Sequence, residues 1–173
     1  MPKDRQRAVQ PPKLDYYHHR IAELGLSESE AQQAGIWPDR KTGDILLFAK
    51  RYDGKTRNIQ PKGERRQRPF TVRRIHPDRL KAGGAKYVSE KDRTPVAYPS
   101  PLAIKNNQQQ ITGGQVAFIE GYFKALALSR AGVESVAFGG ISLYKLDFET
   151  RQYLTARRPD TVLVMYDGDA LDV

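Results

Sequence analysis

Residues 116–126, VAFIEGYFKAL, predict a buried strand that ends in a carboxylate and passes directly into a helix. The four apolar residues at the start form the strand, and Glu120 closes it. The spacing of apolar residues in 122–130 is helical, and Gly132 is placed to end that helix. This segment therefore predicts one strand–helix unit of an α/β sheet.

A second apolar run, TVLVMY at residues 161–166, ends in the triplet DGD, which places Asp167 and Asp169 directly after a strand. Ligands of open parallel sheets bind in the crevice beyond the carboxyl ends of the strands. We therefore expect Glu120, Asp167 and Asp169 to lie at one edge and to bind Mg²⁺, or Mn²⁺, through oxygen ligands. Glu120 is the candidate general acid or base. Asp and Gly also favour ordinary turns, so the triplet alone does not define a metal site.

The region between these two runs continues the alternation of strands and helices. Residues 135–138 predict a strand and 147–157 predict a helix. Strands separated by helices predict right-handed crossovers and a parallel, Rossmann-like sheet over residues 114–173. Because the third strand falls at the end of the chain, we expect this α/β sheet to be incomplete and the chain to be truncated.

The upstream sequence divides into three further segments. Residues 1–13 are polar and predict a disordered leader. Residues 14–42 predict a small helical hairpin, in which Ser27 and Glu30 have the spacing of a capping box. Residues 43–110 predict a basic, β-rich subdomain of α+β type. Its expected elements are strands at 45–49, 70–72 and 86–88, a turn at 52–55, an exposed loop at 65–69 and a polar connection at 106–110.

The positive charge is concentrated in the middle of the chain. The net charge is +9, and residues 50–93 carry 15 Lys and Arg against 5 Asp and Glu, whereas the rest carries 14 against 15. Such a concentration indicates a polyanion partner, most often nucleic acid, although a solvated basic face is the alternative. Tyr52 and Phe70 are candidates for base stacking, with core packing as the alternative for Phe70. The residues we expect to contact nucleic-acid phosphates are Lys62, Arg65, Arg66, Arg68, Arg73 and Arg74.

Three further residues are candidates for phosphate or nucleotide contact. Lys124 lies in the helix after Glu120, and Gly139 and Gly140 follow the 135–138 strand. An exposed helix lysine and a tight turn are the respective alternatives. The chain has no cysteine, which rules out zinc–thiolate sites and favours a cytoplasmic location. No apolar run approaches the roughly 18 residues of a membrane span, so no membrane partner is expected.

The order of these motifs resembles the TOPRIM domain of bacterial-type primases, topoisomerases and certain nucleases. That family has an apolar strand, Glu-Gly, a helix with Ala-Leu, a Gly, Val-Ala-x-x-Gly and a later strand ending in Asp-x-Asp. The matching residues here are 119–121, 125–128, Gly132, 136–139 and 167–169. The resemblance implies that Glu120 is the catalytic acid or base and that Asp167 and Asp169 are metal ligands. Lys124 stands where many primase-type members have Asp.

More loosely, the upstream region is similar to primase-like replication proteins of plasmids, phages and integrative elements. Its points of similarity are residues 17–19, 25–27, 34–36, 76–77 and 86–87. This resemblance implies Mg²⁺-dependent nucleotidyl transfer on a single-stranded DNA template in the replication of a mobile element. Nucleoside triphosphates would be the substrates, and a replicative helicase is a candidate partner. The alternatives are a TOPRIM nuclease and a non-catalytic DNA-binding accessory module.

Overall fold

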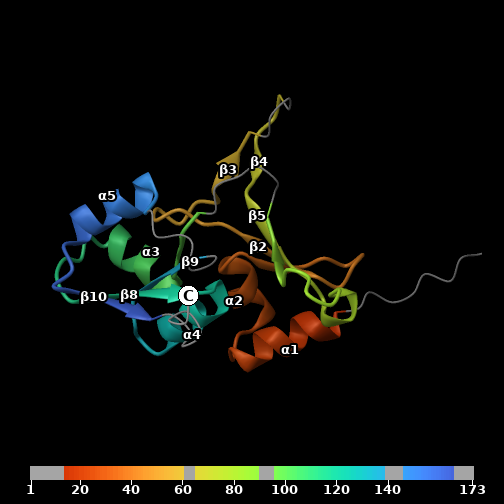
Figure 1. The fold of residues 1–173 in the computed structure, drawn as a ribbon. Coiled ribbons are helices and arrows are strands. Elements are labelled where there is room, and N and C mark those ends of the chain that lie inside the picture. The colour runs from red at the N-terminus through yellow and green to blue at the C-terminus, as the bar shows by residue number, and fades with distance from the viewer. Residues whose placement is uncertain (1–13, 61–64, 90–95, 139–145, 166–173) are drawn as a thin grey trace, which may run out of the picture.

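The molecule is represented by a computed structural model, whose described residues form two four-stranded β-sheets, a two-stranded sheet and the helices that flank them (Figure 1). The structure describes residues 14–60, 65–89, 96–138 and 146–165. The sequence predictions that fall outside the described residues are those on the leader 1–13, Lys62, Gly139, Gly140, Asp167 and Asp169.

The C-terminal sheet is mixed, with three parallel strands and one antiparallel edge strand. The strand order is β10-β8-β9-β7, and β8 is parallel to both β10 and β9, as the alternating pattern predicted. The antiparallel pairing of β7 with β9 was not predicted. The fold is therefore of mixed α/β class. The strand bounds are β7 (Tyr98–Pro99), β8 (Gln115–Glu120), β9 (Ser135–Phe138) and β10 (Thr161–Met165).

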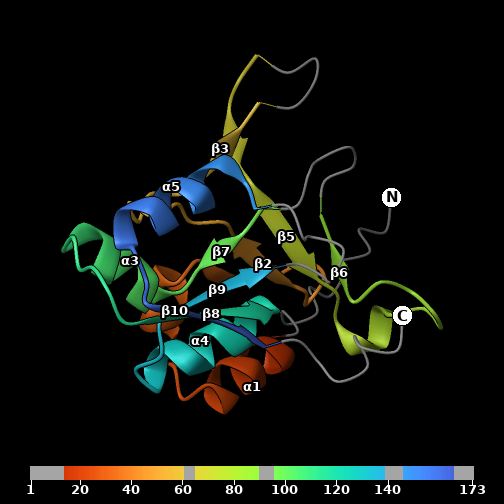
Figure 2. The ribbon, with the colours of Figure 1, turned by 60° about the vertical axis from the view of Figure 1, so that its left-hand side comes forward.

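Helices cover both faces of this sheet, and Figure 2 shows the sheet between α4 and α5. Side chains alternate between the faces, as expected for strands. Val116 and Val136 pack with Tyr153 of α5, whereas Ile119 and Ala137 belong to the cluster on the α4 side. The helix bounds are α3 (Pro101–Gln108), α4 (Tyr122–Arg130) and α5 (Phe148–Arg157). None of the helices in the described ranges is long and apolar enough to span a membrane.

The N-terminal part consists of two short helices and an antiparallel sheet with the order β1-β2-β5-β6. The predicted capping box is confirmed, because the Glu30 carboxylate accepts from the Ser27 N–H at 2.7 Å and the Ser27 hydroxyl accepts from the Glu30 N–H at 3.3 Å. The elements are α1 (Asp15–Glu23), α2 (Glu28–Gln33), β1 (Ile36–Pro38), β2 (Ile45–Phe48), β5 (Thr71–Arg74), the 3₁₀ turn η1 (Pro77–Arg79) and β6 (Tyr87–Val88).

A two-stranded ribbon extends away from the rest of the molecule in both views (Figures 1 and 2). It is formed by β3 (Asn58–Ile59) and β4 (Arg68–Pro69), which pair in antiparallel fashion. Residues 65–69 are exposed, as predicted, although the last two belong to a strand rather than a loop.

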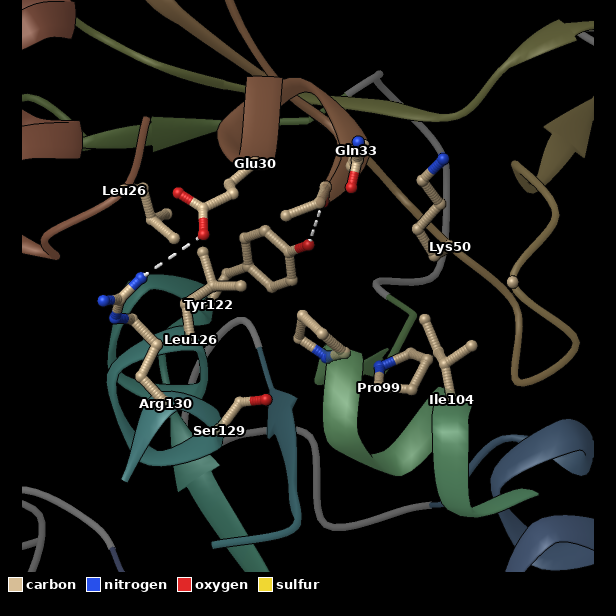
Figure 3. A pocket seen from close by; sticks show the side chains of 13 residues that line it. Leu26, Glu30, Gln33, Lys50, Pro99, Ile104, Tyr122, Leu126, Ser129 and Arg130 are labelled. Atoms are coloured by element: carbon tan, nitrogen blue, oxygen red, sulfur yellow. Dashed lines mark hydrogen bonds and ion pairs between the residues drawn. The ribbon is translucent and has the colours of Figure 1, made fainter. Parts of the chain in front are cut away.

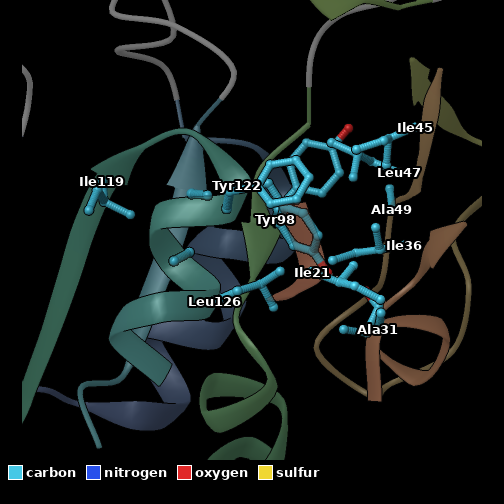
Figure 4. Close-up of a cluster of buried hydrophobic side chains, with 14 of the residues drawn as sticks. Ile21, Ala31, Ile36, Ile45, Leu47, Ala49, Tyr98, Ile119, Tyr122 and Leu126 are labelled. Atoms are coloured by element: carbon cyan, nitrogen blue, oxygen red, sulfur yellow. The ribbon is translucent and has the colours of Figure 1, made fainter. Parts of the chain in front are cut away.

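A single apolar cluster joins the N-terminal part to the C-terminal sheet (Figure 4). Ile21 and Leu47 enter it from the N-terminal part, and Tyr98, Tyr122 and Leu126 enter it from the C-terminal part. Full burial of a large apolar side chain contributes about 1.5–3 kcal/mol. This shared cluster holds the ends of β5 and β6 close to the start of α4, which is where the candidate site lies.

Two predictions about the middle of the chain are corrected by the structure. The strand predicted at 70–72 is observed at Thr71–Arg74, because Phe70 is buried at the point where the chain enters the sheet. The stretch 106–110, predicted as a polar connection, is largely helical. Ser100 caps helix α3 by accepting from the Ala103 N–H at 3.2 Å, and the helix continues to Gln108.

Candidate functional site

Glu120 lies at the carboxyl end of β8, where the strand passes into α4. Gly121 makes this turn with a φ of 91°, a conformation that glycine adopts without steric cost. Met165, the last residue of β10, pairs with Ile119, so β8 and β10 end at the same edge of the sheet. Glu120 therefore lies at the edge of the sheet where β10 also ends. In the sequence, Asp167 follows two residues after the end of β10.

A cavity of about 510 Å³ opens beside Glu120, between the two sheets. We call it the cationic cavity, because Arg20, Arg74, Lys86 and Lys124 all line it. These residues come from α1, β5, the residue before β6, and α4. The other lining residues are Leu47, Phe70, Val72, Tyr87, Ser89, Val96, Tyr98, Gly121, Tyr122, Phe123 and Phe138.

The charges of the cationic cavity act on one another. Repulsion by Arg74, followed by burial and by repulsion from Arg20 and Lys124, lowers the pKa of Lys86. Burial also raises the pKa of Tyr87, despite the opposing effect of the nearby Arg74. Several positive charges therefore share one space, an arrangement that favours an anionic ligand.

Arg74 is the most buried of these cations, at 6% exposure. Its guanidinium donates hydrogen bonds to the hydroxyls of Tyr16 and Tyr87, each at 2.5 Å. It also lies over the ring of Phe123, 4.9 Å from the ring centroid. These contacts fix the guanidinium at the cavity wall, so Arg74 faces the cavity and is largely shielded from the outer surface.

Arg73, the neighbouring predicted phosphate contact, has a structural role. Its guanidinium pairs with Asp39 and, at 3.0 Å, with the fully buried Asp44. Burial of Asp44 would raise its pKa, but hydrogen bonds from the His76 backbone, Arg73 and Arg79 outweigh burial, so the pKa is lowered. Arg73 therefore neutralises a buried carboxylate between β2 and β5.

Three further predicted nucleic-acid contacts, Arg65, Arg66 and Arg68, are exposed on or beside the β3–β4 ribbon. The two candidate stacking residues are buried. Tyr52 stacks on Tyr153 with ring centroids 4.2 Å apart, and Phe70 is 1% exposed. Neither ring is presented at the surface, so among the described residues the predicted nucleic-acid contacts that are exposed are these arginines.

The metal ligand set is only partly within the described structure. Among residues 14–60, 65–89, 96–138 and 146–165, no three acidic or histidine side chains converge on one point. Glu120 is the one member of the predicted triad in these ranges, since Asp167 and Asp169 lie outside them. The donors are all hard carboxylate oxygens, and β8 and β10 end at one edge, so the residues present fit Mg²⁺.

A second hollow, of about 360 Å³, lies between α2, α3 and α4 (Figure 3). Two of its three charged groups face each other, since Arg130 lies 3.9 Å from Glu30, and the third, Lys50, donates to the Thr56 hydroxyl at 3.4 Å. The Tyr122 hydroxyl points to the backbone of α2 and donates to the carbonyl of Ala34. This hollow is lined by two cations and one carboxylate, whereas four cations and one carboxylate line the cationic cavity.

Sequence reasoning did not identify Arg20, Tyr16, Tyr87 or Lys86 as site residues. Lys86 and Tyr87 were included only in the strand predicted at 86–88 and among the points of similarity to primase-like proteins. These residues are separated along the chain and meet only because α1 and β6 pack near the start of α4. A local signal was present only for Lys86, which lies in the basic block.

No protein-family model matches this chain, and no curated protein sequence is significantly similar to it. The function of the chain must therefore be inferred from its sequence motifs and from the geometry and charge of this site.

Proposed function

We propose that this chain carries a TOPRIM-like, primase-type site for Mg²⁺-dependent nucleotidyl transfer on single-stranded DNA. The observation that carries the proposal is the position of Glu120, at the common end of two parallel strands and on the wall of the cationic cavity. The DGD triplet that follows β10 in sequence supplies the further carboxylates. Phosphoryl transfer depends mainly on positioning and charge stabilisation, and this edge offers groups for both.

Each part of the site has a role in this proposal. Glu120, Asp167 and Asp169 would hold Mg²⁺, which when bound neutralises charge on the phosphoryl oxygens. Glu120 would also accept the proton of the attacking hydroxyl. The exposed arginines 65, 66 and 68 would hold the template through its phosphates without reading its sequence.

The test is a denaturing-gel assay with labelled ribonucleotides, single-stranded DNA and Mg²⁺ or Mn²⁺. We expect short products from the wild-type chain and at least a hundredfold loss with Glu120→Ala, since removal of a positioned acid–base group typically costs about 10²–10⁴-fold. Glu28→Ala is the matched control, because Glu28 is an exposed acid in α2 away from the cavity. Equal activity of both variants would contradict the role of Glu120.

The same gel distinguishes the alternatives. A nuclease would shorten labelled DNA without added nucleotides, and Glu120→Ala would abolish that cleavage. A non-catalytic DNA-binding module is favoured by the exposed arginines of the ribbon. Such a module would bind DNA and form no products, and neither Glu120→Ala nor metal chelation would change its DNA binding. Either result would overturn the primase proposal.

A further inference from the structure

Arg74 differs in its partners from Arg157, the other buried arginine of the described residues, and from its less buried neighbour Arg73. Arg157 pairs with Glu134 at 2.8 Å, and Arg73 pairs with Asp44 at 3.0 Å. The described hydrogen-bond partners of Arg74 are instead two neutral tyrosine hydroxyls, and within the described residues no carboxylate forms an ion pair with it. A buried charge without an opposite charge is costly, so this position favours an anion in the adjoining space.

The other cations of the cavity strengthen this preference. The pKa of Lys86 is lowered first by Arg74 and then, after burial, by Arg20 and Lys124. Arg20 also forms an ion pair with Glu23, so the main repulsion in the absence of a ligand is that between Arg74 and Lys86. A ligand with several negative charges would relieve the repulsion at more than one cation. A single carboxylate would relieve it at only one.

The first turn of α4 lines the same space through residues 121–124. Gly121 occupies the N-cap and has no side chain with which to cap the helix. The N–H groups of a first helical turn carry partial positive charge and are suited to bind phosphate oxygens. The helix start therefore adds backbone donors to the side-chain cations.

The sheet face that carries Arg74 also presents apolar side chains to the cavity, among them Leu47 and Val72, and Phe70 lines it as well. The cavity volume, about 510 Å³, lies within the usual range of small-ligand sites, roughly 300–1,000 Å³. The cavity thus combines cationic groups with apolar surface and has sufficient volume for a nucleoside.

We propose that the cationic cavity binds the triphosphate group of a nucleotide in the absence of metal. Arg74 is the central anchor, held in place by Tyr16 and Tyr87, and Lys86 and the first turn of α4 contact the outer phosphates. The triphosphate could be that of a free nucleotide or that of a strand with a 5′-triphosphate. The choice of a nucleotide rests on the proposed function, whereas the polyphosphate preference rests on the cavity itself.

The test is equilibrium binding of tripolyphosphate and of ATP to the full chain in EDTA. We expect both to bind, and we expect Lys86→Gln to weaken both by roughly fivefold to tenfold, the effect of removing one charge-assisted hydrogen bond. Lys86 is exposed, so its substitution should leave the fold intact. Lys105→Gln is the matched control, because Lys105 is an exposed lysine in α3 that does not line the cavity.

Two variants test the anchor directly. Tyr87→Phe removes one hydroxyl that orients Arg74 but leaves every charge in place, so we expect weaker binding with an unchanged salt dependence. Lys86→Gln should reduce the salt dependence, because fewer counterions are exchanged on binding. Equal affinity of wild type and Lys86→Gln for tripolyphosphate would overturn the proposal, as would a failure of tripolyphosphate to bind.

A competition arm identifies the source of the triphosphate. Competition by ATP identifies free nucleotides, whereas competition by an oligonucleotide with a 5′-triphosphate, but not by one with a 5′-hydroxyl, identifies strand ends. Failure of the primase proposal alone would be recognisable, because the chain would bind triphosphate in EDTA but would form no products in the nucleotidyl-transfer assay. Conversely, products formed by Lys86→Gln with an unchanged KM for nucleotides would contradict the cavity assignment and leave the primase proposal standing.

Discussion

Arg157 and Glu134 form an ion pair at 2.8 Å, with side chains only 6% and 3% exposed. Glu134 precedes β9 and Arg157 ends α5, so the pair ties this helix to the sheet that carries Glu120. The Glu134 carboxylate also accepts hydrogen bonds from the Tyr153 hydroxyl and from Asn106. The pair is therefore the centre of a buried polar network at the amino ends of β8 and β9, the edge of the sheet opposite to Glu120.

Arg157→Met should destabilise the fold strongly. The substitution leaves the Glu134 charge buried without its cation, which typically costs about 3–5 kcal/mol. Urea denaturation measures the free energy of unfolding, and Arg151→Met is the matched control, because Arg151 is exposed on the same helix. A decrease below about 1 kcal/mol, or equal decreases in the two variants, would contradict this role.

The stability of the fold should decrease in acid below about pH 4. Burial alone would raise the pKa of Asp39, but the Arg73 hydrogen bond and the Lys41 N–H lower it to about 2, and the pKa of Asp44 is also lowered. Groups with depressed folded pKa values stabilise the fold above their unfolded pKa of about 3.9 and lose that contribution as the pH falls through the folded value. The decrease should therefore occur between about pH 4 and pH 2.

Urea titrations at several pH values between 6 and 2 measure this effect. Asp39→Asn should be less stable at neutral pH and should show a shallower decline in acid, because one of the titrating groups is removed. Asp78→Asn is the control, since the Asp78 side chain is 70% exposed. If wild type were equally stable at pH 6 and pH 2.5, the ion pairs of Arg73 would not contribute as described.

The elements of the C-terminal sheet were predictable because their signals are local. Apolar runs followed by glycine predicted β8, β9 and β10 almost to the residue, and α4 was predicted at its observed bounds. The capping box at Ser27 is local in the same sense. The hydrogen-bonding groups and apolar spacing that define these elements lie within a few residues of one another.

The polar stretch 106–110 failed as a prediction because its side chains act over long range. Asn106 donates to the Glu134 carboxylate at 2.7 Å, and Asn107 donates to the Tyr52 carbonyl at 3.0 Å. The composition resembles a linker, yet these amides satisfy buried groups far away in the sequence. The start signal Ser100-Pro101 would have indicated the helix.

The candidate site was likewise predictable only in part. The position of Glu120 was predictable because it directly follows an apolar run that forms a strand. The roles of Arg73 and Arg74 instead depend on which side chains face them in the fold. Arg73 meets two carboxylates, whereas Arg74 meets two tyrosines and a cavity. Adjacent side chains of a strand point to opposite faces, so two neighbouring arginines acquired different environments.

Gly121→Ala should destabilise the fold and displace Glu120. At a φ of 91° an L-residue with a Cβ atom is strained by about 1–2 kcal/mol, although, apart from its chain neighbours, no heavy atom of the described residues lies within 4 Å of the added carbon. The turn must then relax, which moves the end of β8. We expect this decrease in stability in urea denaturation and a larger proportional decrease in nucleotidyl transfer. Gly83→Ala is the control, because Gly83 is exposed, has a φ of 71° and has equally open surroundings. It introduces the same kind of backbone strain away from the candidate site.

Removal of the three ribbon arginines should weaken binding to single-stranded DNA and reduce its salt dependence. Arg65, Arg66 and Arg68 are exposed on a ribbon that extends away from the core, so their replacement by Gln should leave the core intact. The slope of log K against log[salt] should become shallower by about 0.7 for each phosphate that is no longer neutralised. Fluorescence anisotropy with a labelled oligonucleotide at several salt concentrations measures this slope.

A triple variant of equal charge change, with Lys41, Lys105 and Arg151 replaced by Gln, separates local contacts from net charge. These three cations are exposed and lie outside the ribbon. If general attraction of a basic protein explained binding, both triple variants would change the slope equally. A change confined to the ribbon variant identifies β3–β4 as a nucleic-acid contact. That contact should persist in EDTA, because arginine–phosphate pairs require no metal.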